Sequence, residues 1–269
     1  MEGRSKSKLP CITNPAKALA DFLRRDINPR SHLLELNLLL LAFAIGIQDA
    51  VSYPDFQCFA SNQTGNTVML AVGLLDDRAS SLMLSVPTIL LSLGCFLGGV
   101  LAFGQLANLL HATHARWWLL ASSLAQTALS AAATALQHRH PHAATTNATV
   151  LGKAVLALLA LSAGAQVAMV RELKVTDMTT AMATAAWVDI CIDPGILAGV
   201  AKNRSRNRRA GFLLALISGS FAGAAAFKGG GSGLALLVSV VVKAVAAALF
   251  LVDDEGKGWD CGEDGGVRV

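Results

Sequence analysis

Long apolar runs separated by short polar segments dominate the chain. Each run is close to the roughly 20 residues that an α-helix needs to cross a 30 Å hydrocarbon core. The pattern therefore predicts an all-α, polytopic transmembrane helix bundle. The long runs lie at about residues 33–53, 83–109, 117–136, 154–170, 210–227 and 233–252.

Two further apolar segments are short or interrupted. Residues 64–75 follow directly on the polar sequence NQTGNT, and a helix of that length reaches only about 18 Å. The segment 176–200 carries Asp189 and Asp193 and is interrupted by Pro194. If neither segment crosses, the bundle has six crossings, and if both cross it has eight. The count of basic residues in the loops leans towards six.

The chain also contains an internal correspondence, which predicts two related halves at about 33–136 and 154–252. One of its two matches pairs the stretch Gly94–Gly98 with Gly219–Gly223. Each half has a short, broken helix after its first span. If the short segments do not cross, the halves are inverted, and if they do, the halves are parallel. In the other match, the same spacing of small residues and a glutamine occurs in Ala42, Gly46, Gln48 and Ala50 and again in Ala160, Gly164, Gln166 and Ala168.

Composition agrees with a membrane protein. The 269 residues are 54% hydrophobic and 15% charged, against about 25% charged in an ordinary soluble domain. We therefore predict a single transmembrane domain at 32–252, a basic and partly disordered tail at 1–31, and a disordered tail at 253–269. The piece around Ala16–Arg25 is predicted to form a short amphipathic helix on the membrane surface.

The basic residues fall into two clusters, one in the N-terminal tail and one in the run KNRSRNRR at 202–209. Under the positive-inside rule both are predicted to be cytoplasmic, most simply at the plasma membrane. A specific site for anionic lipid is the alternative. Because these residues are not interleaved with exposed aromatics, the charge does not indicate a nucleic-acid partner.

No enzyme, metal site or cofactor is predicted. The five cysteines have no paired spacing, so they suit neither a disulfide framework nor a metal site. The chain has no phosphate-binding glycine loop, no His-Glu-x-x-His and no Gly-x-Ser-x-Gly elbow. Residues 1–31 have no apolar stretch of the kind that precedes a signal cleavage site.

Several polar residues within the apolar chain are candidates for a substrate site, because half-helix ends line such sites in many transporters. The plainer alternative is a capped helix break, and the two interpretations are compatible. Asp49 could likewise serve a site or only the helix end. The candidates are Gln48, Asp49, Asn62, Gln63, Thr64, Asn66 and Thr67 in the first half and Gln166, Thr179 and Thr180 in the second.

Lys243 lies near the middle of the last span, too deep for its ammonium group to reach the interface easily. A charged residue at that depth should have a partner or face a water-filled cavity. Asp49, Asp189 and Asp193 are the carboxylates that could pair with it. The candidate charge pair is Lys243 with Asp189.

The stretch GIQDAVSYPDFQCFASNQTGNTVMLAVGL strongly resembles the signature of the YoaK-like membrane family, also described as domain of unknown function 1275. The resemblance covers about residues 33–252 and implies an integral membrane protein with about six helices and no established activity. Val167 and Ala185 depart from the family's second motif, where Asn and a Thr-Gly pair are usual. The first motif lies in Asp49, Ala50, Ser52, Tyr53, Phe59, Ser61, Asn62, Gln63, Thr64, Gly65, Asn66 and Thr67, and the second in Gly164, Gln166, Ala168, Arg171, Thr179 and Thr180.

The leading functional hypothesis is a transporter or channel-like protein for a small polar or anionic solute. The alternative is a non-transporting scaffold or partner-binding protein, in which the signature only stabilises a helix break. An intramembrane enzyme using Asp49 and Asp189 as an acid pair is weaker, because no nucleophile accompanies them. The lipid bilayer is the expected partner, and the sequence leaves homo-oligomerisation open.

Overall fold

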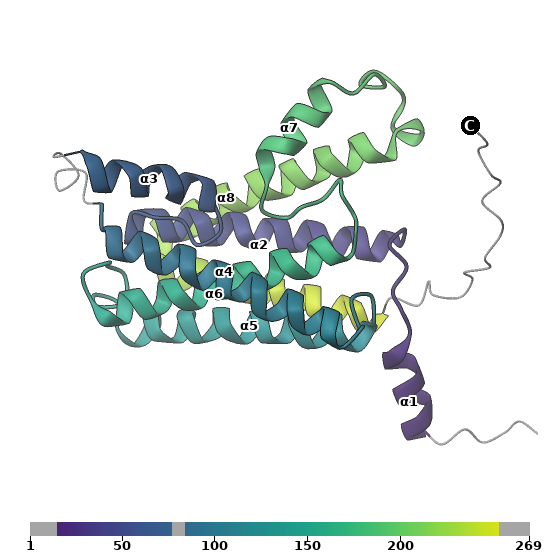
Figure 1. The fold of residues 1–269 in the computed structure, drawn as a ribbon, viewed down its shortest axis with the longest axis horizontal. Helices are drawn as coiled ribbons and strands as arrows, with labels where there is room; N and C mark the ends of the chain where they lie inside the picture. The colour runs from purple at the N-terminus through teal and green to yellow at the C-terminus, as the bar shows by residue number, and fades with distance from the viewer. Residues whose placement is uncertain (1–14, 77–83, 253–269) are drawn as a thin grey trace, which may run out of the picture.

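Helices joined by loops make up the part of the chain that the computed structural model describes, which is residues 15–76 and 84–252. The all-α prediction is therefore confirmed (Figure 1). Residues 1–14, 77–83 and 253–269, including the predicted C-terminal tail, lie outside the described residues. The helices are α1 (Pro15–Arg24), α2 (His32–Phe56), α3 (Gln63–Leu75), α4 (Val86–Leu109), α5 (Arg116–Arg139), α6 (Val150–Glu172), α7 (Ala183–Cys191) and α8 (Arg204–Val252), with a 3₁₀ turn at Val200–Lys202.

Five helices of the described chain are long and apolar enough to cross a membrane: α2, α4, α5, α6 and α8. The 49 residues of α8 are two helices joined at Gly230 and Gly231. Gly231 has φ +76°, in the left-handed region that favours glycine. The run KGGGSG thus contains a tight turn between residues 204–229 and 232–252. The two long runs predicted here are confirmed as separate helical lengths.

The first span is slightly longer than predicted. Ser31 caps its start, since its hydroxyl oxygen accepts hydrogen bonds from Leu33 N at 3.1 Å and Leu34 N at 3.4 Å. The predicted run ends at residue 53, but the helix continues through Pro54 to Phe56 and ends where Gln57 adopts φ +54°. A proline in the last turn removes one hydrogen bond without forcing the chain out of the helix.

α2 and α6 are the central helices. Within the apolar stretch of 18 residues that could cross a membrane, 61% of α2 and 72% of α6 are buried, against 22% of α4. Both parts of α8 pack on α2, in opposite directions. Gly46 of α2 lies against the backbone of Leu216–Ser220 in the first part. In the second part, Ser239 Oγ donates to Ala44 O at 3.1 Å and Ala246 O accepts from Asn37 Nδ2 at 2.8 Å.

Glycines make the closest helix crossings. A side chain at Gly46 or Gly219 would overlap the facing backbone where α2 crosses α8, and one at Gly99 or Gly164 would do so where α4 crosses α6. By contrast, Gly94 and Gly98 have no atom within 4 Å of where a Cβ would lie. Gly94 and Gly98 therefore do not make the contacts of Gly219 and Gly223, with which the sequence pairs them, and the repeat stays a prediction. Gly99 is the α4 residue whose contacts resemble those of Gly219.

The start of α2 meets the start of α8 at one end of the bundle, which we call the basic end. There Glu35 pairs with Arg204 and Arg208. The start of α5 reaches the same end, because Arg116 N donates to Arg25 O at 3.1 Å, just after α1. In Figure 1, α7 lies beside the first part of α8 on this side.

The other end of the bundle, which we call the opposite end, joins the end of α2 to α5 and α6. Asp55 Oδ2 accepts from Gln137 Nε2 at 3.1 Å, and Phe56 O accepts from Asn147 Nδ2 at 3.4 Å. The turn within α8 is also here, since Gly233 lies against His138. Thus α2 starts at the basic end, whereas α6 starts at the opposite end, where α3 packs along α4 (Figure 1).

Candidate functional site

The signature residues hold the connection between α2 and α3 together at the opposite end. The Asp49 carboxylate accepts from Ser61 N at 3.0 Å and from Ser61 Oγ at 2.5 Å. One turn later, Ser52 Oγ accepts from Ala60 N at 3.1 Å. These bonds fold the chain back after α2 and satisfy backbone groups that would otherwise be buried without partners.

Asn66 is the centre of this connection and is fully buried. Its side-chain oxygen accepts from Phe59 N at 2.9 Å, and its amide nitrogen donates to Phe59 O at 2.8 Å and Gln63 Oε1 at 2.9 Å. Ser92 of α4 also donates to Phe59 O, at 2.7 Å. One amide thus closes the loop in both directions and anchors it to a neighbouring helix.

The remaining signature residues shape the start of α3. Asn62 caps the helix, because its side-chain oxygen accepts from Gly65 N at 3.2 Å. Thr67 donates to Gln63 O at 2.8 Å, and both Thr64 and Thr67 are exposed. In the first half, the predicted site residues other than Gln48 therefore form a capped helix break, as the plainer alternative expected.

Gln48 belongs to a different place, the interior of the bundle. Its Nε2 donates to Ser130 Oγ of α5 at 3.1 Å, and Ser130 Oγ lies 3.1 Å from Ser162 Oγ of α6. Lys243 of α8 donates to the same Ser162 Oγ at 3.0 Å, and Ser162 donates to Gln126 O at 3.0 Å. We call Gln48, Ser130, Ser162 and Lys243 the core network. It connects four helices, and each member is at most 1% exposed.

Unpaired acceptors surround the core network. Within the described chain, the side-chain oxygens of Gln48, Gln126 and Gln166 are buried and have no hydrogen-bond partner. Gln166 itself is fully buried and uses its nitrogen to donate to Leu41 O at 3.1 Å. Buried polar atoms usually have partners, so three unpaired amide oxygens in one interior are unusual.

The predicted pair of Lys243 with Asp189 does not form. Asp189 lies at the basic end, where its carboxylate is 3.4 Å from Arg209 Nε, and its side chain is 44% exposed. Lys243 instead faces Ser162 in the interior. The separation follows from the fold, because α7 lies outside the bundle whereas the second part of α8 packs inside it.

Thr179 and Thr180 lie in the loop after α6 at the basic end. Thr179 Oγ1 donates to Met182 O at 3.1 Å. Thr180 is fully buried with φ +57°, and its hydroxyl has no partner in the described chain. They are therefore not in contact with the core network, and the candidates fall into three separate places.

Sequence reasoning missed Ser130 and Ser162. A serine in a transmembrane helix is common and gives no signal by itself, since its hydroxyl can bond to the backbone one turn earlier. The available signal was spacing, because Gln126 and Ser130 lie one turn apart on the predicted span 117–136.

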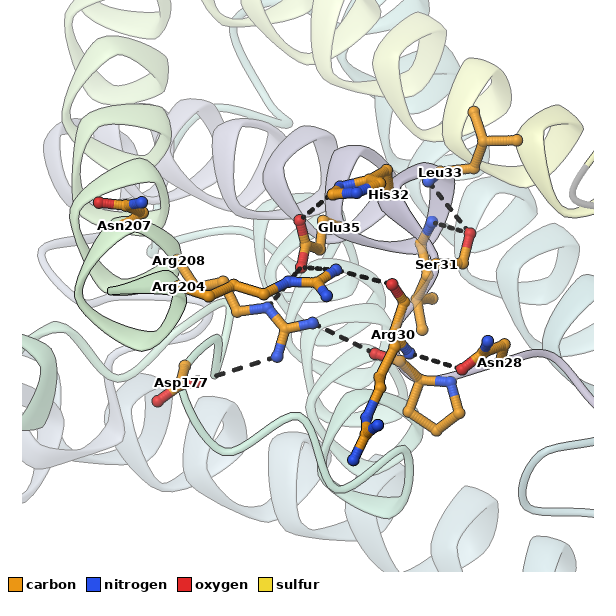
Figure 2. A network of polar contacts seen from close by, with 12 residues as sticks. Asn28, Arg30, Ser31, His32, Leu33, Glu35, Asp177, Arg204, Asn207 and Arg208 are labelled. Carbon is orange, nitrogen blue, oxygen red and sulfur yellow. Dashed lines mark hydrogen bonds and ion pairs between the residues drawn. The ribbon is translucent and has the colours of Figure 1, made fainter. Parts of the chain in front are cut away.

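The basic end carries a second polar network, shown in Figure 2. Glu35 accepts from Arg204 Nε at 2.8 Å and from Arg208 Nε at 2.5 Å, and His32 Nδ1 lies 3.4 Å from its other oxygen. Asp177 extends the network, 3.9 Å from Arg208 Nη1. Glu35 was not among the predicted site residues, although it is a lone acid in the run HLLELNLLLL.

A cavity of about 340 Å³ adjoins this network. Its lining combines charged groups with apolar side chains such as Leu39, Met178 and Val200, all close to the start of α2 and α8. Nearby, Asp193 accepts from Asn203 Nδ2 at 3.0 Å and from Gly195 N at 2.7 Å. These two hydrogen bonds hold the pKa of Asp193 below its ordinary value.

A comparison with protein families matches residues 37–249 to a model described as a protein of unknown function, DUF1275. Neither the curated proteins nor the solved structures include a significant match. The matched region spans α2 to the second part of α8, so it includes both the signature and the core network. The chain therefore belongs to the DUF1275 family and is a membrane protein of unknown function.

Proposed function

We propose that this protein is a multi-pass plasma-membrane transporter or channel-like protein for a small polar solute, which passes through the interior of the bundle. The core network is the observation that carries the proposal. Polar side chains from four helices contact one another at buried positions, although placing each of them inside a bilayer costs free energy. The protein acts by passage of solute rather than by catalysis.

Helix lengths support six crossings. α3 and α7 have 13 and 9 residues and reach only about 20 Å and 14 Å, less than a 30 Å hydrocarbon core. The six remaining helical lengths are α2, α4, α5, α6 and the two parts of α8. The clusters of basic residues at the basic end favour a cytoplasmic location for that end.

The two glycine crossings support an internal repeat of opposite orientation. Gly46 of α2 lies against the backbone of Leu216–Ser220, and Gly164 of α6 lies against Phe96 and Val100 of α4. The sequence pairs these two glycines, while α2 and α6 start at opposite ends. Inverted halves of this kind are common in transporters, where the solute binds between them near the middle of the membrane.

The test is solute uptake into proteoliposomes by the purified full chain. A set of small polar solutes is screened, and wild type is compared with Gln48→Leu, which removes one arm of the core network. We expect uptake above protein-free vesicles and at least a tenfold loss in Gln48→Leu. Thr67→Val is the matched control, because Thr67 is an exposed signature residue whose hydroxyl contacts only Gln63 O.

A scaffold or partner-binding role is the second candidate, and the signature favours it. Asp49, Ser52 and Asn66 are all engaged in closing the α2–α3 connection, which requires no solute. If Gln48→Leu and wild type take up every solute alike, or neither exceeds empty vesicles, the transport proposal fails and the scaffold role is preferred.

A further inference from the structure

Lys243 is a buried cation without a matching anion. It is 1% exposed, and its ammonium group has three N–H donors, of which one reaches Ser162 Oγ at 3.0 Å. In the described chain no carboxylate oxygen lies within 4.0 Å of it. A buried, unpaired charge costs several kcal/mol after relaxation, so an isolated ammonium here is unfavourable unless something neutralises it.

The helices around Lys243 present neutral groups. α2 contributes Gln48, α5 contributes Gln126 and Ser130, and α6 contributes Ser162. The carboxylates of α2 are engaged at the two ends of the bundle, Glu35 by two arginines, Asp49 by Ser61 and Asp55 by Gln137. The groups that face Lys243 therefore supply no negative charge to balance its ammonium group.

We propose that the core network binds a small monovalent anion that also carries a hydrogen-bond donor, with Lys243 as its charge partner. This inference rests on the proposed function and specifies the class of solute. The anion's negative oxygens accept from the two remaining N–H donors of Lys243. The donor of the anion satisfies one of the unpaired amide oxygens of Gln48 and Gln126. Both residues are tied to the Ser162 hydroxyl that Lys243 contacts, Gln48 through Ser130 and Gln126 through its backbone oxygen.

Three probes of similar size separate the features of this site. Glycolate has both the negative charge and a hydroxyl donor. Acetate has the charge alone, and ethylene glycol has the donors without the charge. We expect glycolate to bind best, because only it satisfies both Lys243 and an unpaired amide oxygen.

Binding is measured first, as the rise in the thermal unfolding midpoint of the full chain in detergent at constant pH and ionic strength. At a concentration well above its dissociation constant, glycolate is expected to raise the midpoint of wild type by about 2–4 °C. Acetate should give a smaller shift and ethylene glycol none. Lys243→Met should lose the glycolate shift, whereas Lys243→Arg, which keeps the charge, should retain part of it.

Uptake into proteoliposomes separates the two proposals. Glycolate could raise the unfolding midpoint of wild type and Lys243→Arg but not of Lys243→Met, while no solute enters the vesicles. In that case the anion site stands and the transport proposal fails. If solutes enter but Lys243→Met behaves as wild type, transport stands and the anion site is wrong. Equal shifts for glycolate and ethylene glycol, or no shift for any probe with a folded wild type, also overturn the inference.

Discussion

The two ends of the bundle are closed in different ways. At the basic end, Glu35 binds Arg204 and Arg208, which lie 169 and 173 residues away in the chain. At the opposite end, Asn66 and Asp49 bind Phe59 and Ser61, which lie only 7 and 12 residues away. One end is thus held by pairs of opposite charges between distant segments. The other is held by a local motif after α2 and by hydrogen bonds from the uncharged side chains of Gln137 and Asn147 to Asp55 and Phe56.

The stability of the basic end should therefore depend more on the salt concentration than that of the opposite end. Ion pairs between partly exposed side chains weaken with added salt, whereas hydrogen bonds inside a buried loop respond little. If the protein alternates between conformations, we expect the basic end to open more easily. Three substitutions test this difference between the two ends, and they follow in order of decreasing expected effect.

The largest effect is expected for Asn66→Ala. The substitution leaves Phe59 N without its partner in a buried loop, and it removes the second donor to Phe59 O and the donor to Gln63 Oε1. A buried unsatisfied group costs about 1–3 kcal/mol, and each further lost hydrogen bond about 1 kcal/mol. We expect a loss of about 2–4 kcal/mol of stability, seen as a clear drop in the thermal midpoint in detergent. Asn62→Ala is the control, because it removes only an exposed helix cap worth about 1 kcal/mol. Equal effects of the two variants would contradict a central role for Asn66.

A smaller effect that depends on salt is expected for Glu35→Gln. The neutral amide cannot hold two guanidinium groups as strongly, and hydrogen bonds to charged groups contribute about 1.5–3 kcal/mol. Since Glu35 and Arg208 are 18% and 15% exposed, part of this is screened by solvent. We expect wild type to lose more thermal stability than Glu35→Gln between low and high salt. Parallel salt curves for the two proteins would show that these pairs do not close the basic end.

The smallest effect is expected for Asp55→Asn, the matched neutralisation at the opposite end. Asparagine keeps an acceptor oxygen for Gln137 Nε2, so the hydrogen bond to α5 survives. We expect a change of no more than about 0.5 kcal/mol and a salt dependence like that of wild type. The same thermal measurements across salt concentrations test this. A salt response as large as that of Glu35→Gln would remove the distinction between the ends.

Local sequence predicted the helices well because helix formation depends on neighbours in the chain. The start of α3 was recognisable from Asn62, whose side chain accepts a hydrogen bond from the backbone N–H of Gly65, three residues later. The break in α8 was recognisable from its glycines, although the tightness of the turn was not. Which glycine of α4 lies at a helix crossing was not predictable, because only the facing helix α6 distinguishes Gly99 from Gly94.

The sequence alone was enough to predict a helical membrane protein that resembles the DUF1275 family and has a capped helix break as one interpretation of its signature. These predictions rest on long apolar runs, on the signature residues and on hydrogen bonds between residues close in the chain. Only the tertiary structure decided that Lys243 meets Ser162 rather than Asp189, and that Glu35 meets two arginines. These partners lie on different helices, and their distances depend on where the helices cross, which no local pattern of residues specifies.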